Sequence, residues 1–126
     1  MLLNHVALNI LNQEEFKNFY QNILGMKESK SFILNKNLAK NIFNIAKEIP
    51  VLLCQKDELY LELAINPVKN EKQRFFHLCI SVNNREALLK KAKENNYEAI
   101  HIKRDSPDLI FIKDKNGNCF ELKEKT

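Results

Sequence analysis

The sequence predicts an α+β fold in which one domain contains two β-α-β-β-β modules, about residues 1–67 and 74–126. Its length of 126 residues suits a single domain. Two stretches, HVALNI (5–10) and FFHLCISV (75–82), alternate apolar with other residues and carry a histidine. Each stretch is followed by a polar capping residue, an amphipathic helix and further strand-like segments.

In the first half, Asn12 is placed to cap a helix whose apolar residues recur at helical spacing until Gly25. Residues 26–34 have the pattern of a weak strand, and apolar spacing predicts a second helix from about 36 to 48, ahead of Pro50. The segments VLLCQ and ELYLELAI flank a polar pair, Lys56-Asp57, and are expected to form a hairpin.

In the second half, Asn83-Asn84 is expected to cap a helix that carries Ala87, Leu89 and Ala92. The remaining alternation predicts strands near 97–103, 108–113 and 118–123, with the sequence DKNG as a turn before the last strand.

Composition excludes several functional classes. No apolar run approaches the roughly 20 residues of a membrane span, and the net charge of +4 comes from scattered lysines without a nucleic-acid-binding motif. The first residues lack the features of a secretion signal, and three cysteines without metal-ligand spacing suit reduced thiols. We therefore expect a cytoplasmic protein with a small-molecule substrate, and no membrane or nucleic-acid partner.

The face of each predicted sheet that points away from the helices carries ionisable side chains. Strand alternation gives the opposite face to apolar residues such as Leu8, Leu63 and Phe120. The outward face then carries His5, Asn9, Tyr60, Glu62, His77, Cys79, Cys119 and Glu121, separated by small residues. Imidazole and carboxylate together suit a divalent transition metal, and each half supplies one of each. The conjunction predicts a metal site where any single residue would not.

In these stretches, together with LYLELAIN and FIKDKNGNCFELKEK, the chain resembles the vicinal oxygen chelate superfamily over nearly its whole length. That group includes glyoxalase I, bleomycin-resistance and fosfomycin-resistance proteins, and methylmalonyl-CoA epimerase. The resemblance implies paired modules that form a curved mixed sheet around a metal-binding cleft. It also implies closure within one chain or across a homodimer, and we expect a homodimer.

By this resemblance His5, Glu62, His77 and Glu121 occupy the metal-ligand positions of bacterial glyoxalase I, which implies nickel, cobalt, zinc or manganese. Asn66 matches an asparagine that contacts glutathione in that enzyme. Asn9 stands where glyoxalase I has a glutathione-binding arginine, and the segment RDSPDLI is shorter than the corresponding loop. The resemblance implies the chemistry of glyoxalase I without fixing lactoylglutathione as the substrate.

The first functional hypothesis is a lyase or isomerase, glyoxalase-like or epimerase-like, that removes a proton next to a metal-bound carbonyl through an enediolate. Glu62 or Glu121 would be its catalytic base. Asn9, Tyr60, Asn66 and Cys79 are candidate substrate contacts, although Cys79 and Cys119 are expected chiefly to be small buried residues. His101 is expected at a partly exposed edge with no role.

Two alternatives stay open at this point. One is a metal-dependent thiol transferase or dioxygenase of the same superfamily, for which two histidines and one glutamate suffice. The other is a non-catalytic protein that binds a small molecule of the antibiotic type.

Overall fold

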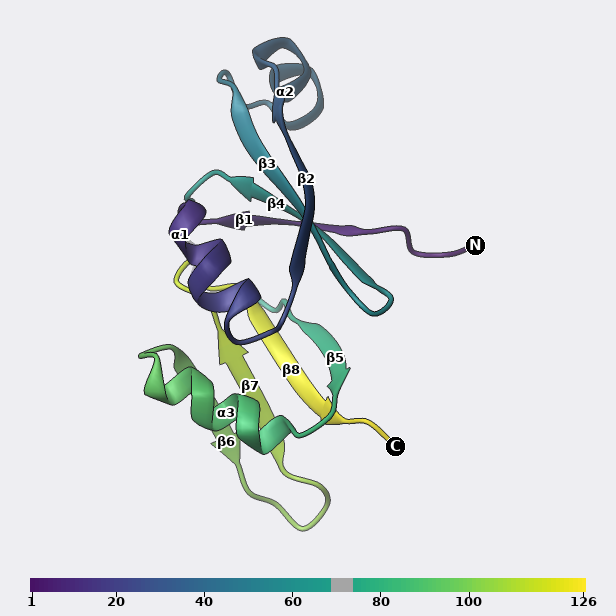
Figure 1. Cartoon of the computed structure of the whole chain (residues 1–126), viewed down its shortest axis with the longest axis vertical. Coiled ribbons are helices and arrows are strands. Elements are labelled where there is room, and N and C mark those ends of the chain that lie inside the picture. Colours follow the sequence, from purple (N-terminus) through teal and green to yellow (C-terminus); the bar gives the residue numbers. More distant parts are fainter. Residues whose placement is uncertain (69–73) are drawn as a thin grey trace. The chain divides into compact units, whose positions relative to one another are not determined.

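The computed structural model describes residues 1–68 and 74–126. The chain divides into two compact units, Met1–Val68 and Lys69–Thr126. Each unit carries one four-stranded sheet that contains both parallel and antiparallel neighbours (Figure 1). The predicted α+β class and its repeated module are confirmed. That both modules act as a single domain stays a prediction.

The first unit contains the elements of the first predicted module, in the predicted order. Its sheet has the strand order β1-β4-β3-β2, in which β1 and β4 are parallel and the other pairs are antiparallel. The elements are β1 (Val6–Ile10), α1 (Gln13–Glu15), η1 (Phe16–Gln21), β2 (Lys27–Leu34), α2 (Lys36–Phe43), β3 (Ile49–Lys56) and β4 (Leu59–Ile65).

The first helical segment is capped as predicted but is wound differently. The Asn12 side chain accepts a hydrogen bond from the Glu15 N–H, and Gly25 follows the helix with φ of +75°. Between them, η1 is a π-helix, in which the Leu24 N–H donates to the Phe19 carbonyl, five residues earlier. The predicted apolar stripe is nevertheless buried, including Phe19 and Tyr20. The spacing of apolar residues therefore identified the buried face although it did not reveal the winding.

The second helix is shorter than the sequence predicts. It ends at Phe43 because Asn44 adopts a left-handed conformation, with φ of +60°. Ile45 then packs beside a buried cluster of Ala39, Ile49 and Val51, and Ile49 already belongs to β3. The apolar spacing that suggested one helix up to residue 48 thus combines a helix, a turn and the start of a strand. All three parts place apolar side chains in or against the same buried cluster.

The second unit repeats this plan with one regular helix. Its elements are β5 (Leu78–Val82), α3 (Arg85–Glu94), β6 (Glu98–Ile102), β7 (Leu109–Lys113) and β8 (Cys119–Glu124), in the sheet order β5-β8-β7-β6. The Asn84 side chain caps α3 by accepting from the Ala87 N–H, as predicted. The Glu124 carboxylate also accepts from the Asn84 and Arg85 N–H groups, at 2.6 and 3.1 Å. A carboxylate is favourable at this end of a helix dipole.

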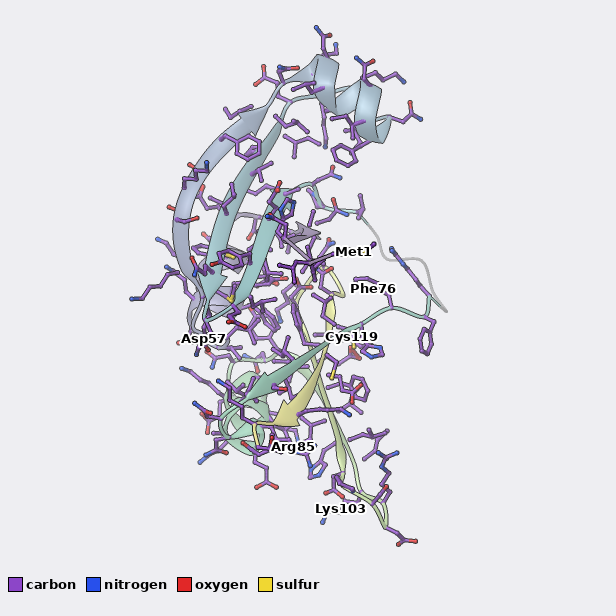
Figure 2. All side chains as sticks on the ribbon, turned by 90° about the vertical axis from the view of Figure 1, so that its right-hand side faces the viewer. Met1, Asp57, Phe76, Arg85, Lys103 and Cys119 are labelled. Carbon is purple, nitrogen blue, oxygen red and sulfur yellow. The ribbon has the colours of Figure 1, made fainter. Side chains whose placement is uncertain are left out.

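Several element boundaries differ from the predictions by one to three residues. The first strand of each unit starts at Val6 and at Leu78, because these are the first residues paired with the neighbouring parallel strand. Both histidines therefore lie immediately before their strands. The turn of the first hairpin lies at Asp57-Glu58 rather than Lys56-Asp57, and Asp57 has a positive φ of 51°. Figure 2 labels Asp57 at this turn. Within residues 1–68 and 74–126, no helix is long and apolar enough to span a membrane.

Candidate functional site

The first unit brings His5 and Glu62 together. The pairing of parallel β1 with β4 places Ala7 opposite Glu62, and His5 lies two residues earlier on the same face. His5 Nε2 lies 2.5 Å from Glu62 Oε2, while its Nδ1 lies 3.0 Å from the Asn4 side-chain oxygen. The two side chains are 41% and 24% exposed, so this pair is open to solvent. A small molecule or ion can therefore reach both groups.

The second unit makes the corresponding pair from His77 and Glu121. Here the pairing of β5 with β8 places Cys79 opposite Glu121, and His77 again lies two residues earlier. His77 Nε2 lies 3.2 Å from Glu121 Oε1, with side chains 31% and 14% exposed. The His77 ring also meets Phe75 and Phe111 edge to face, each with a centroid distance of 5.9 Å. These rings restrict the orientations of the imidazole.

The two pairs are built in the same register. In both units the histidine stands two residues before the residue that faces the glutamate across a parallel strand pair. Within the described parts of the chain, no cluster of three or more His, Cys, Asp or Glu side chains is arranged to hold a metal ion. Each unit by itself thus offers one nitrogen ligand and one carboxylate ligand. These are donors of the kind that divalent transition metals bind.

The predicted substrate contacts of the first unit have partners in the protein. The Asn66 side-chain amide donates to the Asn9 side-chain oxygen at 3.0 Å, and Asn66 is only 6% exposed. Tyr60 is exposed on the same face as Glu62, and its hydroxyl accepts from the Gln55 amide at 3.1 Å. Access to Asn66 is therefore restricted, whereas the Tyr60 ring is open. The roles of all three in substrate binding stay predictions.

The cysteines differ in exposure. Cys79 is exposed and Cys119 is half-buried, so the expectation that Cys79 is a buried packing residue is wrong. Cys119 lies on β8, where Figure 2 labels it. Loss of hydration, and then the nearby Glu121 carboxylate, raise the pKa of Cys79. Burial likewise raises the pKa of Cys119. Both thiols are therefore held in the protonated form, which is the weaker nucleophile and ligand.

Two neighbours of these pairs were not predicted from the sequence. Phe111 faces Glu121 across β7 and β8, and Leu53 faces Glu62 across β3 and β4. Alternation could have indicated to which face of its own strand each of these residues points. It could not indicate which residues stand opposite the glutamates, because the register of pairing depends on the whole sheet.

The part of the chain from residue 2 to residue 122 matches the family model described as the Glyoxalase/Bleomycin resistance protein/Dioxygenase superfamily. Among solved structures, the chain is similar to a glyoxalase family protein from Enterococcus faecalis. The identity is 22% and the TM-score 0.72, with 96% of this chain and 95% of that chain covered. No match was found among the curated proteins.

Similar structures also include FosX, a genomically encoded fosfomycin resistance protein from Listeria monocytogenes. Its hexagonal form has 16% identity and a TM-score of 0.76, with 100% of this chain and 94% of that chain covered. The same protein complexed with Mn(II) and a sulfate ion has 17% identity and a TM-score of 0.71, with coverage of 98% and 92%. These likenesses concern the fold. With the family match over most of its length, the chain belongs to the Glyoxalase/Bleomycin resistance protein/Dioxygenase superfamily.

Proposed function

We propose that this protein is a divalent-metal-dependent enzyme that moves a proton next to a substrate carbonyl, as a glyoxalase-like or epimerase-like lyase or isomerase. The observation that carries the proposal is the matching register of the two His–Glu pairs, His5–Glu62 and His77–Glu121. Two copies of one ligand arrangement suit a shared ion with two nitrogen and two carboxylate ligands. The pairs would combine within one chain or across a homodimer.

The histidines and the glutamates of the two pairs would have different roles. Imidazoles bind metals through a neutral ring nitrogen, so His5 and His77 would anchor the ion through Nε2, the atom now facing each carboxylate. A bound divalent ion would supply Lewis acidity to a carbonyl oxygen of the substrate. Glu62 or Glu121 would accept the proton from the adjacent carbon and return it to the product. Phe75 and Phe111 would keep the His77 ring oriented.

The test is the transition-metal content of the protein, purified without a histidine tag and measured by elemental analysis. We expect metal near one ion per site in the native chain and its loss in His5→Ala and in His77→Ala. The matched control is His101→Ala, which removes a histidine from outside the two pairs and should keep the metal. Circular dichroism of each variant would establish that it folds.

Metal retention would justify assays with α-oxoaldehyde hemithioacetals and with acyl-CoA epimers. The proposal would be overturned if neither the native protein nor any of its variants takes up nickel, cobalt, zinc or manganese after incubation. A non-catalytic small-molecule binding protein would then be the better conclusion.

The likeness to FosX favours one second candidate, a metal-dependent addition of a nucleophile to an antibiotic of the fosfomycin type. Two histidines and one glutamate would suffice for it, so Glu62→Gln distinguishes the candidates. We expect this variant to abolish the proton-transfer reaction if Glu62 is its base. Manganese-dependent loss of fosfomycin that survives Glu62→Gln would support the second candidate instead.

A further inference from the structure

One row of side chains crosses the first sheet through Glu62. From Glu62 toward the edge of the sheet, the row continues with an apolar side chain and then a cationic one. Residues that are paired across neighbouring strands point to the same face of a sheet. The register therefore places on one face, from β1 to β2, the residues Ala7, Glu62, Leu53 and Lys30. We call these four residues the Glu62 row. Leu53 is half-buried and Lys30 is exposed.

The neighbouring row on the same face is mainly apolar and is partly covered by α2. It contains Asn9, Ala64, Val51 and Phe32. Val51 belongs to the buried cluster with Ala39 of α2, and Leu53 and Ala64 pack against that cluster. Figure 2 shows α2 on the concave side of the curved strands β2 and β3. The α2 segment and the sheet residues that pack with it thus form an apolar wall next to the Glu62 row. Phe32, 42% exposed, extends this wall toward the edge of the sheet.

The edge of this face carries unneutralised positive charge. Lys27 is paired with Gln55, which is itself paired with Tyr60 on the next strand. A bulge in β2 lies between Lys27 and Lys30. Among the ion pairs formed by the described residues, none involves Lys27 or Lys30. An exposed lysine attracts a carboxylate or phosphate as a point charge. Anionic groups are therefore favoured at this edge.

We propose that the substrate is an amphipathic anion whose oxygenated head lies at His5–Glu62 and whose anionic end lies at Lys30. Its apolar middle contacts Leu53 and the wall formed by the α2 segment. Glu62 and Lys30 stand two strands apart, which corresponds to about 10 Å between their Cα atoms. A linear aliphatic acid or alkyl phosphate of medium length spans this distance. This inference rests on the proposed function, because it assigns the substrate class of the same site.

The first experiment needs no metal. The full-length, metal-free protein is titrated with butyrate, octanoate, octyl phosphate and octylamine, and binding is followed by the backbone amide NMR shifts of β2, β3 and β4. Each fully buried methylene strengthens binding about fourfold, so partial burial of the longer chain predicts octanoate at least about tenfold tighter than butyrate. Octylamine should bind more weakly than either octyl anion. Whichever anion binds more tightly identifies the end group as carboxylate or phosphate.

Two charge-reversal variants make the test specific to the Glu62 row. Lys30→Glu should weaken octanoate binding about five- to tenfold, since attraction at an exposed position becomes repulsion. Lys17→Glu makes the same charge change at an exposed lysine of η1 and should leave the affinity within twofold. Equal binding of octanoate and butyrate, or equal effects of the two variants, would overturn the inference.

A second experiment separates this inference from the proposed function. Manganese-loaded protein is titrated with acetohydroxamate, whose two oxygens can chelate a metal. It is also titrated with suberic monohydroxamate, in which six methylenes and a terminal carboxylate replace the methyl group. Tighter binding of the longer compound, lost in Lys30→Glu, supports the substrate class. Equal binding of both compounds overturns it and leaves the proposed function standing. If neither hydroxamate binds, the proposed function fails and the assignment of a substrate fails with it.

Discussion

Outside the two His–Glu pairs, the Asp108 carboxylate is held by both a side chain and a backbone group. His101 Nε2 lies 2.7 Å from its Oδ2, and the Arg104 N–H donates to its Oδ1 at 3.3 Å. Arg85 donates to the Asp108 carbonyl oxygen at 2.6 Å. These contacts hold the two ends of the loop between β6 and β7, which includes Lys103 (Figure 2). His101 therefore has a structural partner that its strand position did not reveal.

The hydrogen bond with His101, followed by the one from the Arg104 backbone, lowers the pKa of Asp108 below its ordinary 3.8. A carboxyl whose pKa is lower in the folded state stabilises the fold above its unfolded pKa and loses that contribution as pH falls through the lowered value. We expect Asp108→Asn to lower Tm at pH 6. The difference from the native protein should shrink below about pH 3.8, measured by circular dichroism from pH 2 to 7. Asp105→Asn, at an exposed aspartate of the same loop, is the control. A difference that is constant over this range would contradict the assignment.

The element with the greatest bearing on the proposed substrate class is α2. It has eight residues and buries only Ala39, so its stability depends on its ends. At its start the Asn35 side chain accepts from the Leu38 N–H at 2.9 Å. At its end the Asn44 N–H donates to the Lys40 carbonyl at 3.0 Å, and Lys40 Nζ lies 2.6 Å from the Asn44 side-chain oxygen. Capping thus fixes the wall beside Glu62.

Removing the cap at the start should loosen this wall. We expect Asn35→Ala to lower the free energy of unfolding by about 1 kcal/mol, because the Leu38 N–H loses its acceptor. Asn35→Asp keeps an acceptor and should stay within a few tenths of a kcal/mol of the native protein. Asn37→Ala, inside the same helix, should not destabilise, since alanine favours helix. Urea unfolding measures all three. A loss in Asn37→Ala equal to that in Asn35→Ala would argue against a capping effect.

Each compact unit contains half of the predicted ligand set. The pairs His5–Glu62 and His77–Glu121 each form within their own unit. A ligand that binds the folded state raises its stability by mass action. The effect of metal on unfolding therefore reports whether the two pairs act together.

We expect manganese or nickel at 100 times its Kd to stabilise the native chain by about 2.7 kcal/mol. Both His5→Ala and His77→Ala should abolish the rise in Tm, because a shared ion needs ligands from both units. His101→Ala should keep the full metal-dependent rise whatever its own Tm. Differential scanning calorimetry with and without metal measures the effect. If one of the two variants keeps the rise, the ion is bound by one unit alone and the shared site is wrong.

Local patterns in the sequence were enough to predict the module, its repetition and the face of each candidate ligand. Strand alternation predicted that Glu62 and Glu121 point to the face away from the buried Leu63 and Phe120. Side chains along a strand point to the two faces in turn. Asn12 and Asn84 were recognisable as caps because a capping side chain acts within three residues. Such features depend on local geometry alone.

Which residues stand side by side became apparent only in the folded sheet. Leu53 and Lys30 lie in line with Glu62 through strand pairing between segments far apart in sequence. The end of α2 was equally hidden, because Ile45 and Ile49 share a buried cluster with the helix without belonging to it. Apolar spacing records the need for burial, whereas the partner that meets this need is set by the register and packing of the folded sheet.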